Sequence, residues 1–140
     1  MTMLMAMLQE LAASGEAYLA RLDEHWQGDL ELKLKLALTD VGSAILLNPG
    51  TGFIALQIAR PFVVSSYVRA VGYIEMCWVD PVKRRQGLAR ALVRAAEDWF
   101  GDRGLDFVEL HYLSANPTAA AFWQACGYEA FRTACRRQLG

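Results

Sequence analysis

The chain has 140 residues, a length typical of one domain with a single core, and its net charge at neutral pH is −1. Apolar residues make up 54% of it and charged residues 21%, a balance typical of folded globular proteins and not of disordered chains. The lack of a basic excess argues against a nucleic-acid partner, and no apolar run approaches the roughly 18 residues that span a bilayer. We therefore expect one domain, residues 1–140, with neither nucleic acid nor membrane as a partner.

The cysteines indicate a reducing compartment. Cys77, Cys126 and Cys135 are few and odd in number, which does not suit a disulfide framework. Their spacing to one another and to the two histidines matches no metal site, so no metal is expected. The first basic residue is Arg21, so the N-terminus lacks the basic region of a signal peptide. We expect a cytoplasmic protein.

The N-terminal segment, residues 1–28, is predicted to be helical. Residues 3–13 have a helical composition, and Ser14-Gly15 interrupts them. Residues 16–27 predict a second helix with apolar side chains near one stripe, which Gly28-Asp29 is expected to end. Both helices are expected to pack on a sheet, and a substrate-lining role for them remains open.

A series of strands is predicted next. Residues 30–38 carry leucine at every second position, a period of two that predicts a half-exposed strand despite the helical propensity of leucine. Residues 43–47 and 53–58 predict two further strands, joined by a hairpin turn at residues 48–52. Residues 60–69 are expected to form a loop.

The central stretch combines a strand, a turn and a helix. Residues 73–79 predict a strand, and Asp80-Pro81 ends it because proline cannot donate to a ladder. An amphipathic helix is predicted from Gly87 to Phe100. The first amides of a helix lack internal partners and carry partial positive charge, and a glycine lets a diphosphate approach the backbone. The turn adds the charges of Lys83, Arg84, Arg85 and Arg90.

The C-terminal third predicts a strand over residues 105–113 and then a helix. Asn116 is a suitable N-cap, and Pro117 suits the first helical position. The apolar stripe of this helix is Ala119, Phe122, Trp123 and Cys126. Residues 128–139 allow one long strand or two very short strands.

Three stretches resemble signatures of the GNAT superfamily of N-acetyltransferases. Arg84-x-x-Gly87-x-Ala89 resembles its R/Q-x-x-G-x-G/A motif, and residues 116–128 resemble its N-x-x-A-x-x-F-Y-x-x-x-G-F signature. Residues 74–81 look like its fourth strand, and the whole resemblance covers residues 72–128.

The resemblance implies an α/β (α+β) fold with a mixed, mostly antiparallel sheet flanked by helices. Its fourth and fifth strands would splay to admit acetyl-CoA. The family's order begins with a strand before two helices. We expect residues 30–38 to take the place of that strand, the alternative being that this chain has lost it.

The resemblance also implies how acetyl-CoA, the co-substrate, is held. Turn amides would bind its pyrophosphate, and arginine side chains would reach its phosphates. Backbone groups at the end of the fourth strand would pair with the pantetheine arm, and the amide of Val79 would polarise the thioester carbonyl. The expected cofactor-binding residues are Cys77, Trp78, Val79, Arg84, Arg85, Gln86, Gly87, Leu88, Ala89, Arg90, Asn116, Phe122 and Trp123. Without the resemblance, the turn would be interpreted as a solvated basic surface.

Glu75 is the candidate general base. Many family members carry an acidic residue on the fourth strand, and a carboxylate among apolar neighbours suits this work. The alternative is an outward-facing strand residue. Glu109 and His111 lie two residues apart on the next strand and hence on one face of the sheet. They could act together as an auxiliary general base, or they could be ordinary exposed residues.

The general acid is left open. The family often places a tyrosine where this chain has Trp123, and an indole cannot give up a proton usefully. Tyr112 and Tyr128 are substitutes by proximity only.

We therefore predict an acetyl-CoA-dependent N-acetyltransferase. It would move the acetyl group to a primary amine of a small molecule or peptide by direct attack in a ternary complex. The alternative is a non-catalytic acyl-CoA-binding or interaction module on the same fold. A nucleotide-phosphate binder is a third hypothesis, but the chain lacks G-x-x-x-x-G-K-[ST]. A short C-terminal strand would leave a bare sheet edge, so we expect a homodimer.

Overall fold

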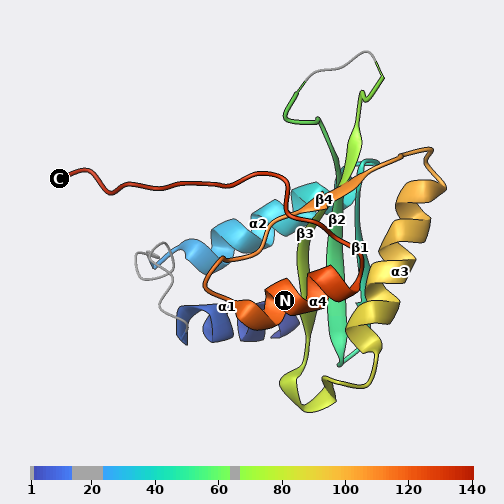
Figure 1. Cartoon of the computed structure of the whole chain (residues 1–140). Coiled ribbons are helices and arrows are strands. Elements are labelled where there is room, and N and C mark those ends of the chain that lie inside the picture. The colour runs from blue at the N-terminus through green and yellow to red at the C-terminus, as the bar shows by residue number, and fades with distance from the viewer. Residues whose placement is uncertain (1, 14–23, 64–66) are drawn as a thin grey trace.

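The computed structural model describes residues 2–13, 24–63 and 67–140. In these residues one sheet has the strand order β1-β2-β3-β4, with helices on both faces (Figure 1). The elements are α1 (Thr2–Ala13), α2 (Trp26–Thr39), β1 (Ser43–Asn48), β2 (Gly52–Ala59), β3 (Val71–Val79), a 3-10 turn (Pro81–Lys83), α3 (Leu88–Gly101), β4 (Val108–Leu110) and α4 (Pro117–Ala125). The first three strands are antiparallel neighbours, and β4 pairs with β3 in parallel. The predicted mixed, mostly antiparallel sheet is confirmed.

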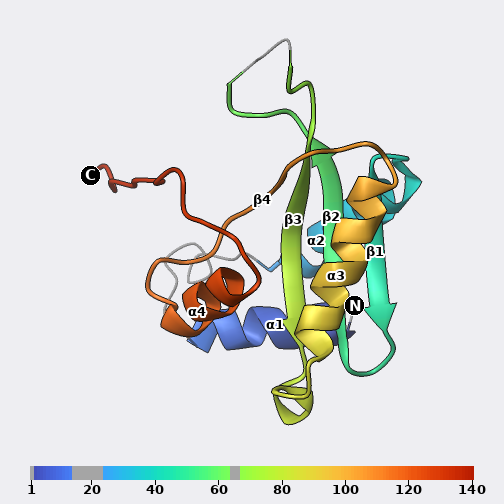
Figure 2. The ribbon, with the colours of Figure 1, turned by 45° about the vertical axis from the view of Figure 1, so that its right-hand side comes forward.

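The main core lies between α3 and the sheet. Leu92, Val93, Ala96 and Phe100 point from α3 onto β2 and β3, in agreement with the amphipathic pattern predicted for this helix. Trp123 of α4 belongs to the same cluster and is 7% exposed. The core thus fixes α3 and α4 beside the end of β3 (Figure 2).

A second apolar cluster lies on the opposite face of the sheet. Leu4 and Met7 of α1 are buried against Phe53 of β2 and Trp78 of β3, whose rings lie 6.4 Å apart. Leu30 and Leu34 of α2 pack against this cluster. Helix α1 is therefore held against the C-terminal half of β3.

Strand β3 separates from β4 halfway along its length. The last pair of this parallel ladder is Ile74 with Leu110. At the same place the β2 ladder steps from Leu56↔Ile74 to Ala55↔Met76, so Glu75 is the extra residue of a β-bulge. Beyond the bulge, β2 is the one strand among the described residues that pairs with β3. The splay predicted between the family's fourth and fifth strands is thus present between β3 and β4.

The prediction of a strand over residues 30–38 was wrong. These residues belong to α2, which continues through Gly28 and does not end there. Leucine, lysine and glutamate are good helix formers, and this propensity decides the structure because no second strand pairs with the segment. Leu30 and Leu34, four residues apart, contact the core, whereas Leu32, Leu36 and Leu38 are 57%, 61% and 62% exposed. Residues 16–23 of the predicted second helix lie outside the described residues.

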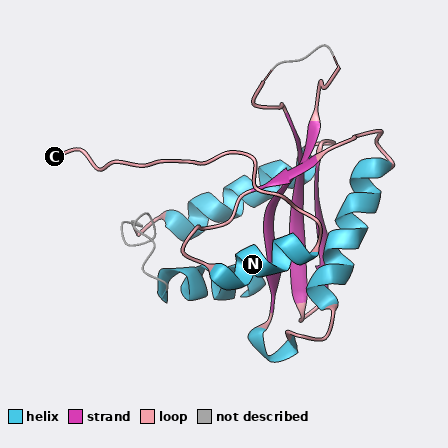
Figure 3. Cartoon of the chain, viewed as in Figure 1, coloured by secondary structure: helices cyan, strands magenta, loops and turns pink. Residues whose placement is uncertain are grey.

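The sheet therefore begins later than expected. Residues 30–38 do not supply the family's first strand, and β1 is the first strand of the described part of the chain. The strand predicted over residues 105–113 is reduced to Val108–Leu110. The closing strand or strands predicted within residues 128–139 are absent, and residues 128–140 are loop (Figure 3). The helix at residues 3–13, the hairpin at residues 48–52 and both later helices are confirmed.

Candidate active site

The turn after β3 presents backbone amides to solvent. Asp80 starts it by accepting a hydrogen bond from the Val82 amide at 2.9 Å. Arg85 and Gly87 have φ values of 63° and 79°, and α3 begins directly after Gly87 with no side-chain cap. Because a Cβ built on Gly87 meets nothing within 4 Å, the space above the first turn of α3 is open. A left-handed arginine is strained by about 1–2 kcal/mol, and such strain concentrates at functional turns. This geometry fits an anionic group at the helix start.

Arg84 is directed away from this open space. Its Nε donates to the Val79 carbonyl at 2.8 Å, and its two terminal nitrogens donate to the Glu10 carboxylate at 2.8 and 2.7 Å. Trp78 Nε1 donates to the same carboxylate at 3.1 Å. The predicted contact of the Arg84 side chain with a phosphate therefore has no support in the geometry. Arg84 instead anchors the turn to α1, which places Glu10 among the residues that sequence reasoning missed.

The free edge of β3 exposes alternate backbone groups. The Asp80 amide donates to Thr51 on the β2 side, and the Val79 carbonyl faces the other side, where Arg84 occupies it. By the alternation of a ladder, Cys77 also directs its amide and carbonyl away from β2, whereas Trp78 directs them toward it. Of the three residues predicted to pair with the pantetheine arm, Cys77 and Val79 are thus oriented for it. Trp78 contributes its side chain to the second apolar cluster instead.

The Cys77 thiol is not a nucleophile. Burial raises its pKa to about 12, and neighbouring Cys126 adds to this effect. A thiol with this pKa is protonated at neutral pH, whereas the thiolate is the reactive form. The Cys77 thiol is therefore poorly suited to an acyl-cysteine route.

A hollow of about 150 Å³ lies beside the turn, between α3 and the end of α4. It is lined by Arg90, Val93, Arg94, Glu97 and Cys126. Arg90 Nη2 also donates to the Ala125 carbonyl at 2.5 Å and so connects the two helices. Two arginines at the mouth of this hollow suit a phosphorylated ligand.

Tyr128 supplies a polar atom without a protein partner in this region. Its Oη is buried and has no partner at normal hydrogen-bond distance in the part of the chain that the structure describes, but Glu97 lies near enough to act on its pKa as a hydrogen-bonding neighbour. Burial raises the pKa of Tyr128, with Glu97 and Cys126 as further causes. A buried hydroxyl without a partner fits a place where a polar ligand group completes the hydrogen bond.

The predicted contacts from α4 are mainly structural. Asn116 accepts a hydrogen bond from the Ala119 amide at 3.0 Å, so its side chain caps the helix. The Trp123 ring is buried against Phe122 and Tyr128, with ring centres 4.9 and 5.4 Å apart. The packing role of Phe122 and Trp123 is confirmed, and Trp123 is no proton donor. In the motif, Leu88 and Ala89 pack against the main core, which leaves their backbone for a ligand, while Gln86 is exposed.

Polar side chains gather where β3 and β4 separate. Tyr73 Oη and His111 Nδ1 lie 2.5 Å apart, and Glu75 and Glu109 are near enough to raise the pKa of Tyr73 in addition to burial. Glu75 is exposed, so it lacks the apolar surroundings on which its prediction as a base depended. Glu75 and Glu109 thus lie near Tyr73, whose hydroxyl contacts His111, a grouping that was not predicted because sequence reasoning paired only Glu109 with His111. Tyr73 was missed, although its position two residues before Glu75 was the available signal.

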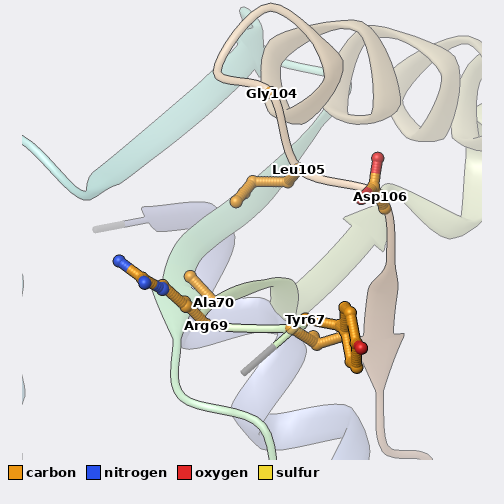
Figure 4. Close-up of a pocket in the computed structure, with 7 residues that line it drawn as sticks. Tyr67, Arg69, Ala70, Gly104, Leu105 and Asp106 are labelled. Carbon is orange, nitrogen blue, oxygen red and sulfur yellow. The ribbon is translucent and has the colours of Figure 1, made fainter. Parts of the chain in front are cut away.

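A larger hollow, of about 240 Å³, lies at the other end of β3. Tyr67, Arg69 and Ala70 line it from the segment before β3, opposite Gly104, Leu105 and Asp106 from the connection between α3 and β4 (Figure 4). It is a full strand length from the turn and does not belong to the candidate site.

Within residues 2–13, 24–63 and 67–140, no cluster of three or more acidic, histidine or cysteine side chains is arranged to hold a metal ion. No helix within them has both the length and the apolar character needed to cross a membrane.

The chain is similar to known acetyltransferases. The model of the acetyltransferase (GNAT) family matches residues 51–128. Aminoglycoside N(6')-acetyltransferase type 1 from Klebsiella aerogenes is 35% identical over 88 residues, which are 62% of this chain and 57% of that protein. The chain therefore spans little more than half the length of this curated relative.

Two solved structures share the fold. Aminoglycoside antibiotic 6'-N-acetyltransferase AAC(6')-IG from Acinetobacter haemolyticus has a TM-score of 0.70 at 19% identity, with 81% of each chain covered. Aminoglycoside N-acetyltransferase AAC(6')-Iy, solved in complex with CoA, has a TM-score of 0.65 at 25% identity. That match covers 84% of this chain and 92% of the other.

Proposed function

Because the chain belongs to the acetyltransferase (GNAT) family, whose model matches residues 51–128, we propose that it is an acetyl-CoA-dependent N-acetyltransferase. The acceptor is a primary amine, which attacks the thioester directly while both substrates are bound. The observation that carries this proposal is that the turn at Gly87 adjoins the free edge of β3. The amide-rich turn at Gly87 lies at one end of β3, and the free edge of β3 leads from there to the opening at Glu75.

The cofactor is proposed to follow this path. Its pyrophosphate lies on the amides between Arg85 and the first turn of α3, with Arg90 and Arg94 as the neighbouring charges. Its pantetheine arm runs back along β3, paired with the outward amide and carbonyl of Cys77 and with the amide of Val79, whose carbonyl already accepts from Arg84. The thioester then lies near the opening between β3 and β4.

Bound acetyl-CoA supplies the acetyl group as a thioester. The chain's own residues hold the arm, and an outward amide of β3 polarises the carbonyl. The Val79 amide was predicted for this role, but it lies beside the turn, about 13 Å along the strand from Glu75, so the outward Cys77 amide is the nearer candidate. A base at the opening must remove a proton from the ammonium before the nitrogen can attack. Glu75 and His111 are the two candidates for this step.

The acceptor is proposed to approach from the face of the sheet that carries Tyr73, Glu75 and Glu109. Two carboxylates at an open strand edge favour a cationic amine. The Klebsiella relative and both solved structures are named for aminoglycosides, which are polycationic amines, so aminoglycosides stand first among the acceptors to test.

A second candidate is a non-catalytic acyl-CoA-binding module. Two observations favour it: the residue at the family's usual tyrosine position is Trp123, a core residue, and no closing strand is formed by residues 128–140. A CoA thiolate is nevertheless a fair leaving group, so transfer does not require a protein acid.

One experiment separates the two candidates. Acetyl-CoA binding is measured by calorimetry, and CoA release is measured with aminoglycosides, linear polyamines, amino acid amides and a lysine peptide. Binding with amine-dependent release supports the enzyme. Binding without release from any amine supports the module, and absence of binding overturns both.

A further inference from the structure

Tyr73 and His111 form a pair at the mouth of the strand opening. They are 38 residues apart in sequence, yet Tyr73 Oη lies 2.5 Å from His111 Nδ1, and the two rings meet edge to face with centres 5.4 Å apart. His111 directly follows Leu110, the last β4 residue paired with β3, just as Glu75 directly follows Ile74. The imidazole is therefore exposed at the point where the strands separate.

The second ring nitrogen of His111 contacts a cation. Arg132 Nη2 lies 3.5 Å from Nε2, and the same guanidinium lies over the rings of Phe62 and Phe131, at 5.0 and 5.6 Å from their centres. A guanidinium can only donate hydrogen bonds, so this contact requires a lone pair on Nε2. The proton of the neutral ring is then on Nδ1 and is donated to Tyr73 Oη. The two contacts together favour one tautomer, in which the lone pair of Nε2 faces Arg132 in the ligand-free protein, so an acceptor ammonium must displace this guanidinium to reach Nε2.

We propose that His111 Nε2 is the proton acceptor for the acceptor ammonium and that Tyr73 is the positioning residue that fixes the ring. This assignment rests on the acetyl transfer proposed above. The charged and titratable groups around the imidazole are Tyr73 and Glu75 on β3, Glu109 on β4 and Arg132 in the C-terminal loop. The two carboxylates favour a cation beside the ring, and the position of Arg132 shows that a cationic hydrogen-bond donor fits there.

The proton balance is simple. One proton passes from the ammonium nitrogen to Nε2, and the neutral nitrogen forms its bond to the acetyl carbonyl carbon. The carbon–sulfur bond breaks and its electron pair leaves with the thiolate. The proton that the new amide nitrogen loses neutralises the thiolate, and the imidazolium returns its proton to solvent.

The tautomer can be tested in the ligand-free protein. The chain contains two histidines, so His111→Gln assigns the imidazole nitrogen signals in a proton–nitrogen correlation spectrum. We expect wild-type His111 to carry its proton on Nδ1 and Tyr73→Phe to lose this preference. His25→Gln, the matched control, should leave the His111 signals unchanged. A wild-type His111 protonated on Nε2 overturns the proposal.

Turnover tests the catalytic role. With an accepted amine, His111→Gln should lower kcat by about 100-fold, the usual contribution of a positioned base, with acetyl-CoA affinity unchanged. The acid limb of its kcat/KM profile should move toward the pKa of the free amine, because only solvent then removes the proton. Tyr73→Phe should lower kcat less and shift the same limb, and His25→Gln should match the wild type.

The outcomes are distinguishable. Equal rates and parallel pH profiles for the wild type and His111→Gln overturn the role of His111 and leave the acetyl transfer standing. A wild type that binds acetyl-CoA but acetylates no amine overturns the proposed function and this assignment together. Since His111 is exposed, His111→Gln should fold, which an unchanged melting temperature would verify.

Discussion

The carboxylate of Glu10 accepts hydrogen bonds from both terminal nitrogens of Arg84, at 2.7 and 2.8 Å, although the two residues are 74 positions apart in sequence. This pair joins α1 to the turn that follows β3. It also removes the arginine of the R-x-x-G-x-A motif from the groups available to an anion. The backbone of the turn, and not its first arginine, is therefore the main element of the proposed cofactor site.

Replacement of Glu10 by glutamine should weaken the anchoring of α1. The side chains of Glu10 and Arg84 are 46% and 41% exposed, so solvent screens the pair and the loss should be about 1 kcal/mol or less. The hydrogen bond from Arg84 lowers the pKa of Glu10 below its ordinary value of 4.5. The stabilisation from the Glu10–Arg84 pair is therefore fully present above the ordinary pKa of Glu10 and is lost as pH falls through its lowered pKa. Urea unfolding of the wild type and Glu10→Gln should show that the difference between their free energies of unfolding is smaller at acidic pH than at neutral pH.

Glu31 provides a matched control for that comparison. It also pairs with a base, Lys35 at 2.9 Å, but within one exposed helix surface. Glu31→Gln should change stability less than Glu10→Gln at neutral pH. Equal effects of the two substitutions would mean that the Glu10–Arg84 pair does not anchor α1.

Gly87→Asp should abolish acetyl-CoA binding, because its carboxylate would occupy and repel the diphosphate position. Gly87→Asn is the matched control, since asparagine has the same shape and both residues tolerate the left-handed backbone that φ of 79° requires. Calorimetric titration should show tighter binding by the asparagine variant. Identical affinities of the two variants and the wild type would contradict the assignment of the turn.

Gly72→Ala should destabilise the fold by about 1–3 kcal/mol, the usual effect of overpacking. A Cβ at Gly72 would lie 2.6 to 2.8 Å from the ring atoms of Phe100, which is 1% exposed and cannot move away. Gly101→Ala, at the end of the same helix, meets nothing within 4 Å and should be neutral or stabilising by up to about 1 kcal/mol. Thermal melts of the three proteins test this order.

Tyr128→Phe should separate stability from binding. Removal of a buried hydroxyl without a partner should stabilise the ligand-free protein by about 1 kcal/mol, while acetyl-CoA affinity should fall if the hydroxyl serves the cofactor. Melting and calorimetry on the same samples measure both effects. A destabilised ligand-free variant would reveal a protein partner for Oη, and unchanged affinity would place the hydroxyl outside the cofactor site.

Glu75→Gln should act on acceptor affinity more than on chemistry. Because Glu75 is exposed at the bulge, we expect KM for a cationic amine to rise several-fold while kcat stays within about threefold. Acetyl-CoA affinity should remain unchanged. A fall in kcat of about 10²–10³-fold that shrinks at high pH would instead make Glu75 the base.

Elements with local sequence signals were predicted correctly. Asp80-Pro81, Gly87 and Asn116-Pro117 each fix backbone conformation or satisfy helix ends within a few residues, and all three appear where predicted. The family motif likewise pointed to the turn that we propose as the cofactor site. Residues 30–38 show where prediction from a local sequence pattern fails. Their alternation matched a strand, but an alternating pattern specifies a strand only when a neighbouring strand pairs with it.

Which side chains meet depends on the packing of the whole domain. This packing exposed Glu75 by a bulge, engaged Arg84 with Glu10, and brought Tyr73 to His111 across 38 residues. Each of these results depends on strand register and on the docking of α1, which arise from apolar burial over the whole domain. A register shift of one residue reverses the face to which a strand side chain points. The positions of Glu75 and His111 at the strand opening therefore depend on packing and not on the residues on either side of them.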